Sequence, residues 1–221
     1  GGGGSPEPAR NVQVKELSQA FITSGKPVKF DFTKNVTCVV YIGFDSKRTF
    51  GKSTTIVEQL KGKSTLVSEL PSGKIYKLFN IWVGNGGIAT SKNIENPVVC
   101  FKVEKSWIKD KKIDPVSIVL NRYNDKKWER FPVGLSGEDN EFLYFTAETS
   151  GFSSFAITGT TKASSNETIT RVELDYPETI SENNIENKGL QTEQEEIPST
   201  SGFEIYCGVT SLFAIFLYKR K

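Results

Sequence analysis

Short apolar runs separated by polar turn residues fill the chain from Asn11 to Gly159. The runs are rich in Val, Ile, Phe, Tyr and Thr, and Gly, Pro, Asn, Asp and Ser cluster between them; they include NVQV, PVKFDF, TCVVYIGF, TTIVEQL, KLFNIWV, PVVCFKV, VSIVLNRY, KWERFPV, EFLYFTAE and FSSFAIT. In one run Val28, Phe30 and Phe32 alternate with polar residues, which is the period of a strand with one buried face. The pattern therefore predicts about ten strands.

The connections between these runs indicate how the strands pair. YNDKKW (Tyr123–Trp128) and SGEDNE (Ser136–Glu141) are typical of hairpin loops between consecutive strands. EKSWIKDKKID is the one stretch with a helical pattern, and Pro115 follows it. We therefore expect an all-β fold, an antiparallel β-sandwich of the immunoglobulin-like kind with one short helix.

Composition changes on both sides of this body. Residues 1–10, GGGGSPEPAR, predict a flexible linker, and residues 11–159 the β-sandwich domain. Residues 10–159 hold 22 Lys and Arg against 15 Asp and Glu, a net charge of +7, whereas residues 160–200 hold 3 against 9, a net charge of −6. The second stretch is dense in Ser, Thr, Asn and Glu with no sustained period, so we expect a disordered, acidic stalk.

Residues 201–221, SGFEIYCGVTSLFAIFLYKRK, form a third kind of segment. Its uncharged run, Ile205–Tyr218, has 14 residues and is followed by Lys219, Arg220 and Lys221. A spanning helix needs roughly 20 apolar residues, so the run is short for a permanent anchor. Its position after a polar spacer, with cations that resist translocation, predicts a short hydrophobic helix acting as a C-terminal membrane anchor or sorting segment.

Few motifs of this sequence point to chemistry. Histidine is absent, which removes the commonest general base near pH 7 and most zinc-site patterns. FGKST (Phe50–Thr54) lacks the upstream glycine and the following helix of a phosphate loop, and Gly84, Gly86 and Ala89 lack the helix of a dinucleotide site. The lysines are interspersed with acids, so nucleic acid is not an expected partner. We expect no cofactor, no metal and no enzymatic activity.

Cysteine and asparagine residues suggest covalent modification. Cys38 and Cys100 lie in apolar runs and either form a disulfide between the sheets or stay as two buried thiols, and their spacing does not decide between these. Asn35 in NVT and Asn166 in NET are acceptor patterns for N-glycosylation.

The three tryptophans leave a second function open. Trp82, Trp107 and Trp128 either build a sugar-stacking platform or pack as ordinary core and sheet residues. The first reading makes the chain a carbohydrate-binding module, which requires at least two of the rings to lie coplanar on an exposed face.

Several of these runs together resemble a known family. From about Asn11 to Gly159 the chain is similar to the archaeal PGF-pre-PGF domain, on TTIVEQLKGKSTLVSELP, ENPVVCFKVEKSWI, SIVLNRYNDKKWERFPV and YFTAETSGFSSFAITG. The tail resembles the PGF-CTERM sorting signal in its order of motif, apolar run and basic end. Ser150-Gly151-Phe152 and Ser201-Gly202-Phe203 stand at the two Pro-Gly-Phe positions, so serine replaces proline at both.

The resemblance implies a function at the cell envelope. In that family an archaeosortase is thought to cut near the tail motif and to transfer the new C-terminus to a membrane lipid. We therefore expect a non-enzymatic module on the extracellular face of the membrane, with a structural, spacer or adhesive role. Membrane lipid, an archaeosortase-like enzyme, and envelope proteins or glycans are the expected partners.

Overall fold

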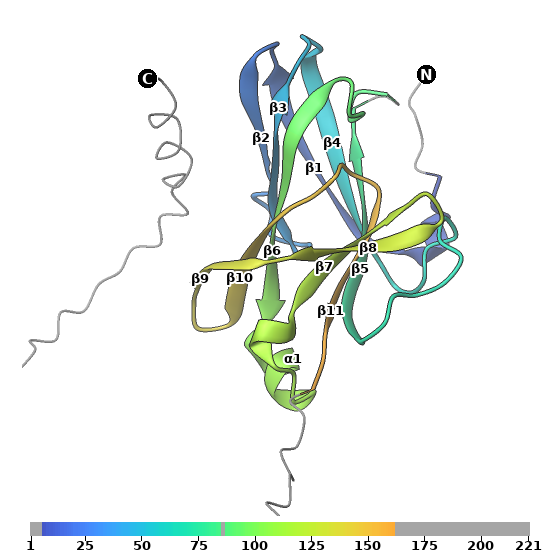
Figure 1. Cartoon of the computed structure of the whole chain (residues 1–221), viewed down its shortest axis with the longest axis vertical. Coiled ribbons are helices and arrows are strands. Elements are labelled where there is room, and N and C mark those ends of the chain that lie inside the picture. Colours follow the sequence, from blue (N-terminus) through green and yellow to red (C-terminus); the bar gives the residue numbers. More distant parts are fainter. Residues whose placement is uncertain (1–5, 85–86, 162–221) are drawn as a thin grey trace, which may run out of the picture. The chain divides into compact units, whose positions relative to one another are not determined.

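Eleven strands form two antiparallel sheets in the computed structural model, which describes residues 6–84 and 87–161 (Figure 1). The strands are β1 (Val12–Ile22), β2 (Lys26–Asp31), β3 (Val39–Ser46), β4 (Gly51–Leu60), β5 (Lys74–Val83), β6 (Ile94–Glu104), β7 (Val119–Asn124), β8 (Lys127–Pro132), β9 (Gly134–Glu138), β10 (Phe142–Glu148) and β11 (Ser154–Gly159). One six-residue helix, α1 (Lys105–Asp110), follows β6. The predicted all-β class, with antiparallel sheets and one short helix, is confirmed.

The order of strands in each sheet differs from their order in the chain. One sheet has the order β1-β4-β5-β11-β7-β8 and the other β2-β3-β6-β10-β9. β10 and β11 are consecutive in the chain but lie in different sheets. The last strand, β11, lies between β5 and β7, which ties the end of the body into the middle of a sheet.

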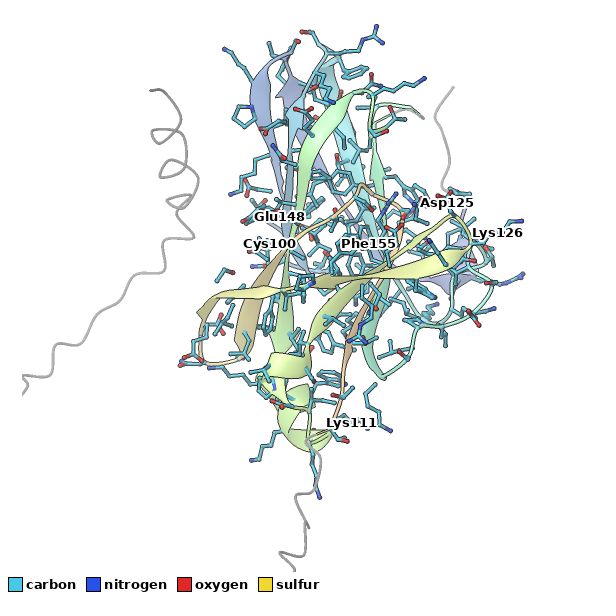
Figure 2. The ribbon with its side chains drawn as sticks, in the orientation of Figure 1. Cys100, Lys111, Asp125, Lys126, Glu148 and Phe155 are labelled. Carbon is cyan, nitrogen blue, oxygen red and sulfur yellow. The ribbon has the colours of Figure 1, made fainter. Side chains whose placement is uncertain are left out.

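One hydrophobic core contains side chains of both sheets. Val28, Phe30 and Phe32 are at most 6% exposed, so the alternation of that run is confirmed. In the core, Phe79 stacks on Phe155 with ring centroids 5.4 Å apart, and Figure 2 shows Phe155 in the middle of the body. Burying these large apolar side chains is the main term that holds the two sheets together.

One predicted hairpin is present as expected, and the second has a different first strand, β9, which includes part of the predicted loop Ser136–Glu141. β7 and β8 are joined by Asp125 and Lys126, which both have positive φ values of 49° and 63°, and Figure 2 shows them at the hairpin tip. A two-residue loop with two positive φ angles matches the right-handed twist of the strands that it joins. The second hairpin joins β9 and β10.

The N-terminal segment belongs to the folded body from Glu7 onward. Glu7 is 4% exposed, residues Ala9–Asn11 form a 3-10 turn, and the Lys61 amide donates to the Asn11 carbonyl at 2.8 Å. Residues 7–10 are therefore part of the domain rather than of the flexible linker predicted for residues 1–10. The linker pattern was misleading because the partners of Glu7 lie far along the chain.

Candidate functional site

The tail residues on which the membrane prediction rests lie outside the described residues. These are Ser201, Gly202 and Phe203 of the sorting motif, Lys219, Arg220 and Lys221 of the basic end, and the acceptor Asn166. Within residues 6–84 and 87–161, no helix is both long enough and apolar enough to cross a membrane.

Asn35 lies in the exposed loop between β2 and β3. Its φ of 60° places it in the left-handed region, which asparagine tolerates better than most residues. The Lys102 ammonium donates to the Asn35 side-chain oxygen at 3.1 Å and to its carbonyl at 3.3 Å. The Thr37 of the same acceptor pattern is 2% exposed. Glycosylation at Asn35 stays a prediction.

Cys38 and Cys100 are both buried, and no disulfide joins them. They lie in the same sheet: Cys38 directly precedes β3, its carbonyl accepts from the Lys102 amide at 2.8 Å, and Cys100 faces Tyr41 across the β3–β6 pair. A disulfide joining the two sheets is therefore absent from this body. Burial raises the pKa of the Cys38 thiol to about 12, so this cysteine is a poor nucleophile.

The three tryptophans lie on separate elements. Trp82 is on β5, where its indole nitrogen donates to Glu58 at 2.9 Å. Trp107 is on α1 and packs against Tyr76, with ring centroids 4.9 Å apart. Trp128 is on β8 and donates to the Glu69 carbonyl at 2.8 Å. No two tryptophan rings contact each other in the described part of the chain, and all three side chains are half-buried. The sugar-stacking platform stays a prediction.

The Ser150-Gly151-Phe152 turn closes the body between β10 and β11. Gly151 has a φ of 147°, which favours glycine, and Phe152 packs against Phe44 with ring centroids 6.0 Å apart. The Ser150 hydroxyl accepts from Arg122 and donates to Glu129, both at 2.7 Å. Serine at this position therefore makes a hydrogen-bond bridge to the β7–β8 hairpin that a proline ring could not make.

A cluster of buried polar side chains lies where the N-terminal segment and the β4–β5 loop meet the sheet. The Glu7 carboxylate accepts from the Asn11 amide group at 2.7 Å, the Thr65 backbone amide at 3.2 Å, the Asn80 amide group at 3.3 Å, and the Ser64 hydroxyl. Burial alone would raise the pKa of Glu7. The four hydrogen bonds together lower it by more than burial raises it, so the pKa lies below its usual value. A deprotonated Glu7 thus holds the two loops together.

Glu58 lies beside this cluster, directly opposite Asn80 across the β4–β5 pair. Its side chain is fully buried, accepts from Trp82, and lies 3.3 Å from the Lys15 ammonium. No sequence pattern points to this group, because its members are separated by up to 73 residues. The contacts described above join parts of the fold, and the carboxylates of Glu7 and Glu58 are buried, so the cluster positions loops.

One pocket of the described body holds no catalytic arrangement. It has a volume of about 470 Å³ and lies at the ends of β1, β4 and β5, lined by Gln13, Leu60, Lys61, Ile75, Tyr76, Lys77 and Leu78. No carboxylate lines it. Within the described ranges, no three His, Cys, Asp or Glu side chains gather as a metal site would need. The residues of this pocket do not suggest a reaction.

Comparisons of the chain with protein-family models, with characterised proteins and with solved structures found no match.

Proposed function

We propose that this protein is a non-enzymatic module of the cell surface, held at the membrane by its C-terminal segment. The observation that carries the proposal is the order of segments: an all-β body, an acidic stretch at 160–200, an apolar run at Ile205–Tyr218, and three closing cations. This order is that of a sorting or anchoring tail, in which the polar stretch separates a folded domain from the bilayer. The body would then act as a spacer, a structural unit or an adhesive surface.

The architecture of the body supports this role. Two antiparallel sheets with a shared core are compatible with the immunoglobulin-like sandwich from which many surface modules are built. The absence of histidine from the whole sequence argues against the commonest acid–base catalysts. Membrane lipid, and an archaeosortase-like enzyme acting near Ser201-Gly202-Phe203, are the partners that the tail would meet.

The experiment is a comparison of three forms of the protein in its source cells. The full chain is expected in the membrane fraction and open to protease added to intact cells, whereas a chain ending at Thr200 is expected in the medium. Ser201→Pro restores the Pro-Gly-Phe motif and is expected to increase the processed fraction. The proposal would be refuted if the truncated chain stayed on the cells, or if the full-length chain were found in the cytosolic fraction.

A further inference from the structure

Three segments meet at one end of the body and are joined by hydrogen bonds. They are residues 22–26 between β1 and β2, residues 45–52 between β3 and β4, and residues 87–95 before and into β6, here called the loop end. The Gly25 amide donates to the Ser46 carbonyl at 2.6 Å, the Ser24 hydroxyl to the Lys47 carbonyl at 2.8 Å, and the Lys47 amide to the Asn93 carbonyl at 2.8 Å. These bonds hold the three segments in one arrangement, as a binding surface made of loops requires.

The loop end is basic. It contains five cations, Lys26, Lys47, Arg48, Lys52 and Lys92, and two carboxylates, Asp45 and Glu95, a net charge of +3. All five cations are exposed. Lys47 forms an ion pair with Glu95 at 2.8 Å, and the other four cations form no ion pair among residues 6–84 and 87–161. Four unpaired cations on one rigid end are free to attract an anion.

The segments around α1 have a net charge of the opposite sign. β6 runs for 11 residues, about 33 Å, from the loop end to the start of α1 (Figure 1). The segments there, residues 104–114 and 138–141, hold four cations and six carboxylates, a net charge of −2. The segments around α1 therefore do not share the positive charge of the loop end.

The chain leaves the described body beside the segment that follows α1. The Asp114 amide donates to the Thr160 carbonyl at 2.8 Å, and Ile113 pairs with Thr161. The loop end is thus the end of the body farther from the chain's exit.

An exposed aromatic ring adjoins the cations. Phe21 is 73% exposed and lies directly opposite Lys52 in the β1–β4 pair. A large apolar side chain at this exposure gains little from folding, whereas it would gain from covering the apolar face of a ligand. Phe21 and Lys52 together present an apolar surface beside a positive charge.

We propose that the loop end binds an anionic polysaccharide, with Arg48, Lys52 and Lys92 meeting its carboxylate or sulfate groups and Phe21 packing against a sugar ring. The inference rests on the proposed surface location, since that places envelope polysaccharide within reach of the loop end. Charge complementarity selects the acidic polymer, and the flexible lysines suit repeated anions along a chain.

The test measures binding of the full chain, in detergent, to immobilised polygalacturonate and dextran sulfate, with neutral dextran as the blank. The Arg48→Glu, Lys52→Glu, Lys92→Glu triple variant is expected to lose at least about tenfold in affinity. The Lys109→Glu, Lys111→Glu, Lys112→Glu triple variant has the same charge change at the opposite end, where Figure 2 shows Lys111, and is expected to keep the parent affinity within about twofold.

Phe21→Ala supplies the second line of the test. Because the ring is largely exposed, the variant is expected to keep the parent melting temperature while binding more weakly. Binding of the parent is also expected to weaken as salt rises, as for any interaction between exposed charges.

Four outcomes would overturn the proposal: no binding by the parent chain, equal losses in the two triple variants, tighter binding to DNA, or tighter binding to vesicles of anionic phospholipid. None of these readouts depends on where the protein sits in cells. A failure here is therefore distinguishable from a failure of the membrane proposal, which the fractionation of the truncated chain decides.

Discussion

Glu7 is the residue that most changes the picture of the N-terminal segment. Its carboxylate is 4% exposed and accepts four hydrogen bonds from two loops and from β5. A buried carboxylate is tolerated only when donors replace the water that it loses. The segment before β1 is therefore fixed by one charged side chain rather than by apolar packing.

Glu7→Gln is expected to lower the free energy of unfolding at pH 7 by about 1–3 kcal/mol, because an amide cannot accept four donors. The folded-state pKa of Glu7 lies below its value in the unfolded chain, so its contribution is complete above the unfolded pKa and is lost as pH falls through the folded pKa. The stability gap between parent and variant should accordingly narrow as pH falls below about 4.5.

Thermal unfolding of parent and variant from pH 7 to pH 3 measures this gap. Glu69→Gln is the control, since Glu69 is an exposed glutamate of the same β4–β5 loop region, and we expect a change within about 0.5 kcal/mol at every pH. A gap for Glu7→Gln that stays constant down to pH 3 would contradict the assigned role of the charge.

The burial of a residue could be predicted from the sequence where it depends on residues nearby in the chain. The alternation of Val28, Phe30 and Phe32 identified a buried face because a strand's period is visible in its own sequence. Glu7 and Glu58 were not predictable as a buried pair of acids, since their burial depends on Asn80 and Ser64, which are distant in the chain. Burial of a polar residue requires partners that only the fold brings near.

At the scale of elements, the β7–β8 hairpin has a turn whose sequence fits its geometry poorly. Asp125 and Lys126 both adopt positive φ, a region where a lysine Cβ is crowded and glycine is favoured. The flanking strands pair from Asn124↔Lys127 to Val119↔Pro132 without a bulge. The regular pairing of β7 and β8 therefore forces Lys126, the second residue of the turn, into a positive φ.

Lys126→Gly is expected to stabilise the protein by about 0.5–1 kcal/mol, because it relieves a left-handed conformation on an exposed residue. Lys127→Gly, one residue later and within β8, should instead destabilise by a similar amount, since glycine weakens an extended strand. Denaturant unfolding of the two variants measures both changes. Equal effects of the same sign would contradict the assignment of strain to Lys126.

The sequence pattern predicted the presence of most strands, but it predicted less well where they begin and end. Each apolar run of the sequence falls in or beside a strand, but β1 continues to Ile22 through residues outside the run NVQV. β9 was not predicted as a strand, because Gly134–Glu138 has only one apolar side chain and its pairing with β10 supplies what its own pattern lacks. α1 is shorter than the helical stretch EKSWIKDKKID, since Lys112 adopts a positive φ.

At the scale of the whole molecule, the loop end and the segments around α1 differ in charge. The chain exits beside α1, where carboxylates outnumber cations, and the loop end carries the unpaired cations. Neither the alternation of apolar residues nor the overall charge of +2 reveals this separation. It depends on which loops the strand order places together, which sequence patterns do not encode locally.

The central claim is that the C-terminal segment attaches this module to the membrane, and mass spectrometry of the native C-terminus tests it most directly. The protein is isolated from the membrane fraction of its source cells, and its C-terminal peptide is weighed. We predict a chain that ends near Ser201-Gly202-Phe203 with the added mass of a lipid, or an intact chain ending in Lys221 that stays with the membrane as a retained anchor. Recovery of the intact, unmodified chain in the soluble fraction alone would contradict the account.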